Sequence, residues 1–212
     1  MLRQLKFGWR KGKGELFMER SAEILRVTTE TNIKLLLKID GQGRFEGSSG
    51  LAFFDHMLNL FTKHGGFDIS LEARGDLEID GHHTVEDIGI VLGQAMKKAL
   101  GDKAGIKRYG QMLLPMDEAL VMLAIDLSGR PFLSYEALLP SQRVGDFDTE
   151  LVEEFIRAFT VNAGITLHLK LLAGTNTHHI IEAIFKGLGR VLKEAVFKDG
   201  GVQGIPSTKG LL

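Results

Sequence analysis

The chain has 212 residues, 44% hydrophobic and 25% charged, with a formal net charge of -1. This composition is typical of a globular protein with a large buried core, and the near-neutral charge gives no reason to expect nucleic acid or an acidic membrane surface as a partner. The chain has no cysteine, which excludes disulfides and thiolate zinc sites and agrees with a cytoplasmic protein that binds small molecules or copies of itself.

The first seventeen residues differ from the rest of the chain. Segment 1–17 is basic but lacks the apolar core of a signal peptide, so we expect a loose N-terminal extension, with Met18 as an alternative start. No apolar run in the chain reaches the roughly 18 residues that a membrane-spanning helix needs. We therefore expect no association with a membrane.

Hydrophobic periodicity predicts a mixed first half, with Asp40-Gly41-Gln42-Gly43 as a hairpin turn and Gly65-Gly66 as the end of a helix. A further turn or strand is expected over 75–80. The expected strands span 24–28, 32–39, 44–47 and 69–73, and the expected helices span 51–63 and 82–100.

The second half repeats this pattern. Ile125 corresponds to Ile39 at an offset of 125 − 39 = 86, and His178 corresponds to His82 at 178 − 82 = 96, so the second copy carries ten extra residues. The expected strands span 120–126 and 165–170, and the expected helices span 150–160 and 178–196. We predict an α+β fold built from a duplicated ββ-α-ββ-α unit, with halves 18–105 and 106–212 packed as one pseudo-twofold domain.

Two histidine pairs stand at equivalent positions in the two halves. They occur in His82-His83-Thr84-Val85-Glu86 and in His178-His179-Ile180-Ile181-Glu182, and together they use four of the seven histidines. Residues four apart share a helix face, whereas adjacent residues diverge by about 100°. In each segment the first histidine and the glutamate can therefore bind one ion, while the second histidine points in another direction. Two such segments predict two metal ions.

The pseudo-twofold symmetry also predicts how the two ions share their ligands. The earlier helix of each half adds one candidate, His56 in the first half and Glu154 in the second, with Glu153 as the alternative to Glu154. One predicted ligand set is His56, His83, His178 and Glu182, and the other is His82, Glu86, Glu154 and His179. Nitrogen and oxygen donors without sulfur suit Mn²⁺ or Fe²⁺, with Zn²⁺ as the alternative.

A basic cluster near the C-terminus suggests a second kind of site. Hydroxyls, backbone amides and a lysine in Pro206-Ser207-Thr208-Lys209-Gly210 are groups that bind a phosphate dianion, although a polar tail has the same composition. The candidate phosphate-binding residues are Arg108, Arg130, Lys186, Ser207, Thr208 and Lys209. Lone histidines such as His64 and His168 are more often core or surface residues than chemical groups.

Several motifs in fixed order make the chain resemble the imidazoleglycerol-phosphate dehydratase family from about Arg26 to Leu211. The motifs are Asp55-His56-Met57-Leu58, the two histidine segments, Pro115-Met116-Asp117-Glu118-Ala119-Leu120, Asp126-Leu127-Ser128-Gly129-Arg130-Pro131 and the C-terminal Pro206–Gly210. One residue departs from the family, because many relatives have histidine at the position of Glu154.

The resemblance implies a ribosomal protein S5 domain 2-like fold, with the helices sandwiched between two four-stranded sheets. It also implies a 24-subunit shell whose active sites, each with two Mn²⁺ ions, are built from more than one subunit. The substrate would be D-erythro-imidazole-glycerol phosphate, which loses water to give imidazole-acetol phosphate in histidine biosynthesis.

Roles for individual residues follow from the same resemblance. Glu30 resembles the family's substrate-contacting glutamate and is our candidate general acid or base, and we add His64 to the candidate substrate-binding residues. The candidate catalytic residues are Glu30, His56, His83, His178 and Glu182. A non-catalytic metal-binding shell protein and a dimetal hydrolase are the alternatives. The predicted phosphate site and Glu30 favour the dehydratase over the shell protein, because metal storage needs no anion pocket.

Overall fold

A computed structural model of the protein describes residues 20–212, so the predicted extension 1–17 lies outside the described residues. The first sheet has the strand order β1-β2-β4-β3, in which neighbours are antiparallel except for the parallel pair β3 and β4. Its strands are β1 (Ser21–Val27), β2 (Thr31–Lys38), β3 (Arg44–Ser48) and β4 (Asp68–Gly75). Buried and less buried residues alternate along β2, because one face of the sheet lies on the core.

The second sheet repeats the topology of the first. Its order is β5-β6-β10-β7, again with one parallel pair, β10 and β7. Its strands are β5 (Tyr109–Met116), β6 (Ala119–Asp126), β7 (Phe132–Glu136) and β10 (Thr166–Ala173), and a small hairpin of β8 (Arg143–Val144) and β9 (Phe147–Asp148) follows β7. Each strand of the first sheet therefore has a counterpart in the second, and the hairpin has none.

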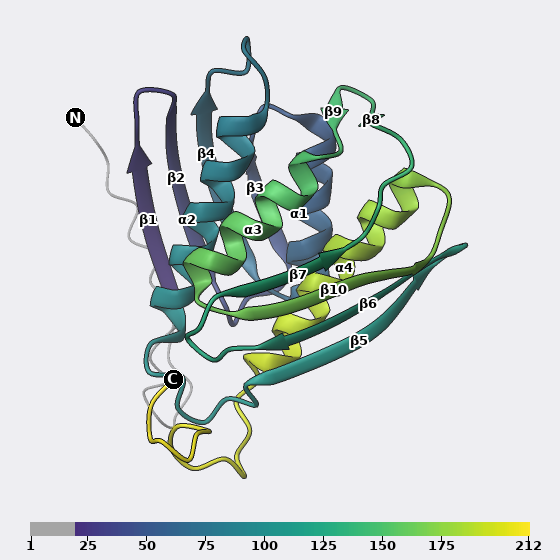
Figure 1. Ribbon diagram of the computed structural model, residues 1–212. Helices are drawn as coiled ribbons and strands as arrows, with labels where there is room; N and C mark the ends of the chain where they lie inside the picture. Colours follow the sequence, from purple (N-terminus) through teal and green to yellow (C-terminus); the bar gives the residue numbers. More distant parts are fainter. Residues whose placement is uncertain (1–19) are drawn as a thin grey trace, which may run out of the picture.

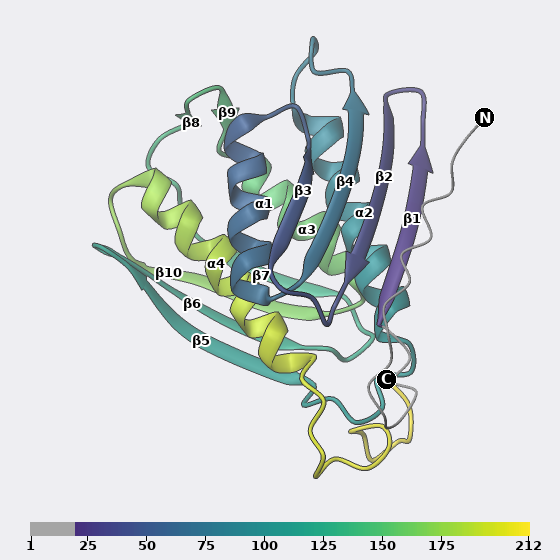
Figure 2. The same cartoon turned by 180° about the vertical axis from the view of Figure 1, so that it is seen from behind.

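Four helices fill the space between the sheets (Figures 1 and 2). They are α1 (Ala52–Gly65), α2 (His82–Leu100), α3 (Leu151–Ala163) and α4 (Thr177–Ala195). Helices α1 and α2 pack on the first sheet, α4 packs on β5 and β6, and the two layers meet where α1 contacts α4 and α2 contacts α3. The predicted α+β class, with helices between two four-stranded sheets, is confirmed.

The order of elements within each half differs from the predicted ββ-α-ββ-α. The observed order is βββαβα, because β3 precedes α1 and the segment after β4 forms turns instead of a strand. In that segment the Ile79 N–H donates to the Asp76 carbonyl over 2.8 Å, which closes a tight turn.

The extra residues of the second half lie between β7 and α3. Arg44 and Phe132 begin equivalent strands at an offset of 132 − 44 = 88, whereas Gly66 and Gly164, which cap α1 and α3, differ by 164 − 66 = 98. The ten inserted residues therefore contain the β8–β9 hairpin. Its Phe147 is buried, with ring centroids 5.4 Å from Phe53 and 5.9 Å from Phe54 of α1.

Equivalent glycines allow the two helix pairs to approach closely. A Cβ atom on Gly189 of α4 would lie 2.4 Å from the Phe61 carbonyl oxygen, and one on Gly93 of α2 would lie 2.6 Å from that of Phe159. Because the backbone of one helix occupies this space in both pairs, a larger residue would force the helices apart.

In residues 20–212, none of the helices combines the length and the apolar character needed to cross a bilayer.

Candidate active site

The N-terminal turn of α4 fixes the directions of two adjacent histidines. The side-chain oxygen of Asn176 accepts hydrogen bonds from the backbone N–H groups of His178 (2.9 Å) and His179 (3.3 Å), which caps the helix. The two imidazole planes then lie at 81° to each other. Adjacent residues on the same turn therefore direct their rings to different partners.

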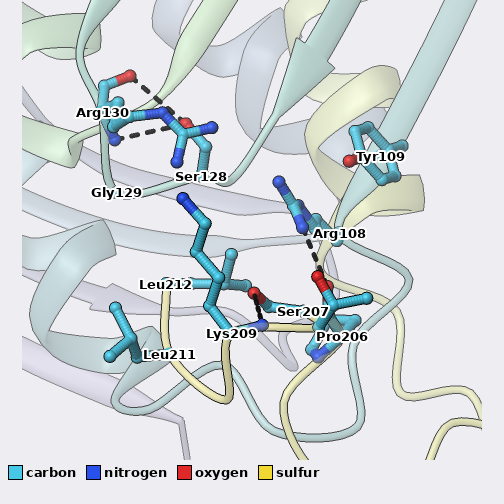
Figure 3. A pocket seen from close by; sticks show the side chains of 11 residues that line it. Arg108, Tyr109, Ser128, Gly129, Arg130, Pro206, Ser207, Lys209, Leu211 and Leu212 are labelled. Carbon is cyan, nitrogen blue, oxygen red and sulfur yellow. Dashed lines mark hydrogen bonds between the residues drawn. The ribbon is translucent and has the colours of Figure 1, made fainter.

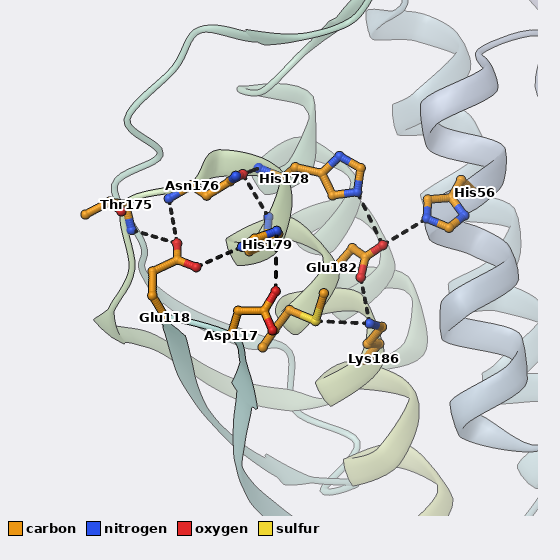
Figure 4. Close-up of polar contacts among 10 residues, drawn as sticks. His56, Asp117, Glu118, Thr175, Asn176, His178, His179, Glu182 and Lys186 are labelled. Carbon is orange, nitrogen blue, oxygen red and sulfur yellow. Dashed lines mark hydrogen bonds and ion pairs between the residues drawn. The ribbon is translucent and has the colours of Figure 1, made fainter.

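His178 and Glu182 meet His56, which comes from α1 in the other half (Figure 4). The Glu182 Oε1 atom lies 3.0 Å from His56 Nε2 and 3.3 Å from His178 Nε2. Glu182 and His178 are one helical turn apart, so they share the face of α4 that contacts α1. The cluster thus joins the two halves of the molecule.

Glu182 is ionised in this cluster although it is buried. Burial is the largest influence on the pKa of Glu182 and would raise it, but the Lys186 ammonium, 2.6 Å from Oε2, and the two imidazoles together lower the pKa to about 2. Lys186 also lies one turn further along α4, so the helix supplies both members of the ion pair.

The cluster fits a divalent metal ion. The ligand atoms of His56, His178 and Glu182 all lie within 4.8 Å of one another, and no other group of three such side chains converges in this way among residues 20–212. Two imidazole nitrogens and one charged oxygen, with no sulfur, are a donor set typical of Mn²⁺, Fe²⁺ or Zn²⁺.

His83, expected with these three ligands, lies at the start of α2 beside other acids. Its Nδ1 atom is 2.9 Å from Asp76 Oδ2, and its Nε2 atom is 3.8 Å from Glu30 Oε1. The hydrogen bond with Asp76 is the main cause of the raised pKa of His83. Glu30 is half exposed in the turn between β1 and β2 and lies near His83, and neither residue belongs to the group formed by His56, His178 and Glu182.

His179 has a similar carboxylate partner. Its Nδ1 atom is 2.8 Å from Glu118 Oε2, and this hydrogen bond is the main cause of the raised pKa of His179. The same bond, followed by backbone N–H groups that include that of Asn176, lowers the pKa of Glu118 to about 2. Neither Glu118 nor Asp76 was among the predicted site residues. Two consecutive acids, Asp117 and Glu118, in a two-residue turn were the available signal.

The second predicted ligand set is not assembled within one chain. Among residues 20–212, His82, Glu86, Glu154 and His179 do not form a group of three or more converging ligand atoms. Glu86 and Glu154 lie on the packed helices α2 and α3, and neither has an ion pair with a described residue. Glu153, the alternative to Glu154, is paired with Arg157.

Five of the predicted phosphate-binding residues line one hollow of about 970 Å³ below the ends of β5 and β6 (Figure 3). They are Arg108, Arg130, Ser207, Thr208 and Lys209. Arg108 is held in place, because its guanidinium donates to both oxygens of Asp126 (2.6 and 3.0 Å) and to the Pro206 carbonyl (2.9 Å). Three cationic side chains around one hollow favour an anionic ligand.

Two other candidate substrate-binding residues lie away from this hollow. Lys186 contacts Glu182 in the His56 cluster, and His64 lies on the last turn of α1. Burial, followed by the positive charges of Lys186 and Arg190, lowers the pKa of His64. His64 is therefore neutral near pH 7 and has one N–H to donate.

Fold and site together define a duplicated α+β protein with a candidate metal cluster between its halves and a cationic pocket at one end of its second sheet. The sequence model of the family described as imidazoleglycerol-phosphate dehydratase matches residues 49–192. Proteins of that name from Acetivibrio thermocellus and Moorella thermoacetica are each 60% identical over 195 residues, which cover 92% of this chain and all of theirs.

Solved structures agree with this similarity. The crystal structure of imidazoleglycerol-phosphate dehydratase from Staphylococcus aureus has a TM-score of 0.74 and 47% identity, covering 82% of this chain and 97% of that one. The enzyme from Pyrococcus furiosus, solved in complex with (S)-C348, has a TM-score of 0.76 and 35% identity, covering 89% of this chain and all of that one.

The chain belongs to the imidazoleglycerol-phosphate dehydratase family. It is accordingly a hydro-lyase of histidine biosynthesis that removes water from imidazoleglycerol phosphate. The predicted family, reaction and enzyme class are confirmed, together with a small phosphorylated substrate.

Proposed function

We propose that the dehydration of D-erythro-imidazole-glycerol phosphate to imidazole-acetol phosphate takes place between the His56 cluster of one subunit and the cationic pocket of another. The observation that carries this proposal is the convergence of His56, His178 and Glu182, because three ligand atoms within 4.8 Å from two helices prepare a metal site. The cofactor is then two Mn²⁺ ions per active site, as the resemblance implied, and a cytoplasmic location stays a prediction.

The separation of the two regions supports a composite site. His178 begins α4, whereas the Ala195 carbonyl at its far end accepts the Arg108 N–H of the cationic pocket over 2.9 Å (Figure 1). The 195 − 178 = 17 residues between them span about 25 Å of helix. This distance is far longer than one substrate molecule, so the metal cluster and the pocket must come from different copies to hold the same substrate.

A homo-oligomer also explains why some ligands are missing from the clusters of a single chain. We propose that His83 of a neighbouring copy joins His56, His178 and Glu182, and that His82, Glu86, Glu154 and His179 complete the second metal site between copies. The 24-subunit assembly expected from the resemblance provides many equivalent interfaces of this kind.

The metal ions would supply Lewis acidity to the imidazole ring of the substrate, which would favour loss of the ring N–H proton. The electron density of the deprotonated ring would help the hydroxyl on the adjacent carbon to leave, and a proton would convert that hydroxyl to water. The protein contributes proton transfer, and Glu30 is our candidate for the C–H proton on the next carbon. Glu30 fits this role because its carboxylate is half exposed and lies 3.8 Å from the Nε2 atom of His83. Loss of this proton gives an enol, which tautomerises to the product.

The cationic pocket orients the substrate through its phosphate. Arg130 and Lys209 supply charge, and the Ser207 and Thr208 hydroxyls supply hydrogen bonds, while the Arg108–Asp126 pair holds the C-terminal loop through the Pro206 carbonyl. We place Lys186 and His64 nearer the cluster, where they contact the substrate from the α1–α4 side.

The experiment that tests this function starts from chelated full-length protein, to which Mn²⁺ and substrate are added while the enolisable product is measured. We expect activity to return with Mn²⁺, Glu30→Gln to lower kcat about 10²–10⁴-fold with metal retained, and Arg130→Ala to raise KM. Glu23→Gln and Arg44→Ala, at exposed surface positions, are matched controls. Product formation that is independent of added metal would overturn the metal site, and an unchanged KM in Arg130→Ala would overturn the phosphate pocket.

A further inference from the structure

Glu118 makes three hydrogen bonds to the segment that leads into α4 (Figure 4). It lies in the turn between β5 and β6, next to Asp117, whose φ of 50° is in the left-handed region. Its Oε1 atom accepts the backbone N–H groups of Asn176 (2.7 Å) and Thr175 (3.2 Å), and its Oε2 atom lies 2.8 Å from His179 Nδ1. One carboxylate thus contacts both the helix cap and the imidazole.

The contact with Nδ1 determines what the other ring nitrogen can do. A carboxylate can only accept a hydrogen bond, so Glu118 keeps the imidazole proton on Nδ1 and leaves a lone pair on Nε2. The Asp117 Oδ2 atom lies 3.6 Å from Nε2, which is longer than a hydrogen bond. This is the tautomer that a metal ion requires, and carboxylates commonly hold metal-binding histidines in this way. The bonds to Thr175 and Asn176 fix the backbone that carries the same ring.

We propose that Glu118 is a positioning residue for metal binding, which holds His179 in the orientation and tautomer that present Nε2 to the ion. This inference rests on the proposed function, in which His179 is a metal ligand. Glu118 does not touch substrate or metal in this role. It gives a function to the Pro115–Leu120 motif, for which the family resemblance alone provided none.

The first half reaches the same arrangement from a different position. There the Asp76 Oδ2 atom lies 2.9 Å from His83 Nδ1, and Asp76 comes from the segment between β4 and α2. The residue equivalent to Glu118 is Glu30, at 118 − 30 = 88, and it lies near His83 Nε2 instead. Both outer imidazoles are therefore held through Nδ1 by a carboxylate, although the two carboxylates are not related by the repeat.

The substitution Glu118→Gln tests this proposal. Glutamine keeps the length of the side chain and one oxygen for the backbone N–H groups, but it turns an NH₂ group towards His179 and so favours the proton on Nε2. Binding of Mn²⁺ to chelated full-length protein would be measured from the EPR signal of the free ion. We expect Glu118→Gln to weaken the affinity of one class of site about 10–100-fold. Glu136→Gln, which removes an exposed carboxylate paired with Lys170, should leave the affinity unchanged.

A double-mutant cycle separates positioning from general stabilisation. In a His179→Ala background the proposal predicts that Glu118→Gln has no further effect on Mn²⁺ affinity, because its route to the metal is already absent. An equal loss in both backgrounds, or wild-type affinity in Glu118→Gln, would overturn the proposal. If Glu118→Gln does not fold, Glu118→Asp, which retains the acceptor, should bind Mn²⁺ more tightly than Glu118→Ala, and equal affinities overturn the proposal. Wild-type protein that binds no Mn²⁺ would instead overturn the proposed function.

Discussion

The contact of α1 with α4 and that of α3 with α2 are equivalent in the fold but differ in charge. In the first, Glu182 has Lys186 one turn away, and in the second the residues at the same positions are Glu86 and Ile90, at an offset of 96. The position of His56 is taken by Glu154 in the second pair, at an offset of 98. At these positions one interface therefore carries an ion pair, and the other carries two carboxylates that have no ion pair with residues 20–212.

This difference shows that duplication preserved the positions of the ligands while the charges around them diverged. In the α1–α4 cluster Lys186 neutralises Glu182, and both histidines lie within hydrogen-bond distance of the same carboxylate. The α2–α3 interface has no such partner among the described residues, so a divalent ion would be its source of positive charge. We expect a bound metal ion to contribute more to stability at the α2–α3 interface. The metal site at the α1–α4 interface should need less rearrangement to bind its ion.

The largest effect should come from Glu182→Ala, which removes the one carboxylate of the α1–α4 cluster. It should lower kcat/KM by more than about 100-fold, since even outer partners of metal ligands are worth 10–100-fold. It also leaves the largely buried Lys186 unpaired, which should reduce the free energy of unfolding by about 3 kcal/mol. Steady-state kinetics and urea unfolding of the chelated protein measure both, and kinetics within a few-fold of wild type would contradict the assigned site.

The helix crossings give the next largest effect, on stability alone. Gly189→Ala and Gly93→Ala should each lower the free energy of unfolding by about 1–3 kcal/mol, because the added Cβ meets backbone atoms of the opposite helix. Gly189→Ala should cost more, since its nearest contact is 2.4 Å compared with 2.6 Å for Gly93. Gly145→Ala is the control for crowding. The added carbon would have no atom within 4 Å, so this variant should show only the backbone strain of a φ of 59°.

Opposite signs are expected for neutralising the two carboxylates in chelated protein. Glu154→Gln should raise the thermal midpoint slightly, because it removes an unpaired charge from the α2–α3 interface, whereas Glu182→Gln should lower it. With Mn²⁺ at 100 times its Kd, wild type should gain about 2.7 kcal/mol, and Glu154→Gln should gain less. A lower midpoint in chelated Glu154→Gln would show that the second interface is balanced by groups not considered above.

The smallest effect concerns two similar arginine–aspartate contacts, Arg20–Asp40 and Arg108–Asp126. The hydrogen bond with Arg20 is the largest influence on Asp40 and lowers its pKa below the ordinary value of 3.8. A lowered pKa in the folded state stabilises the protein above pH 3.8, and this contribution is lost as the pH falls towards the folded-state pKa.

Asp40→Asn should therefore lower the urea midpoint a little at neutral pH and less in acid. In contrast, Asp126→Asn should also raise KM, because Arg108 and the C-terminal loop belong to the cationic pocket. A raised KM in Asp40→Asn would show that the first pair also contributes to substrate binding.

Local patterns predicted the elements that carry the site. The expected helix over 82–100 is α2, and the His-x-x-x-Glu spacing in α4 brought His178 and Glu182 onto one face. Strands β5 and β7 were not predicted, because β5 contains Gly110 and Pro115 and both are edge strands with few fully buried residues. Edge strands have a weaker hydrophobic alternation than β2 or β6.

Contacts between distant elements were harder to predict. The i,i+4 spacing of Glu182 and Lys186 allows an ion pair, but we expected Lys186 to bind phosphate. The sequence does not show which histidines Glu118 and Asp76 contact. The separation of His83 from His56 depends on how α2 and α1 are packed, which residue spacing along one helix does not encode.

The β8–β9 hairpin gives the two clusters unequal surroundings. Phe147 packs on Phe53, whose ring lies 5.3 Å from that of His178, so the insertion reaches the α1–α4 cluster through one aromatic residue. The first half has no corresponding segment between β3 and α1. Substitutions in the β8–β9 hairpin could therefore change the metal affinity of the α1–α4 cluster, or the access of an ion to it. They would leave the proposed second metal site and the duplicated fold unchanged.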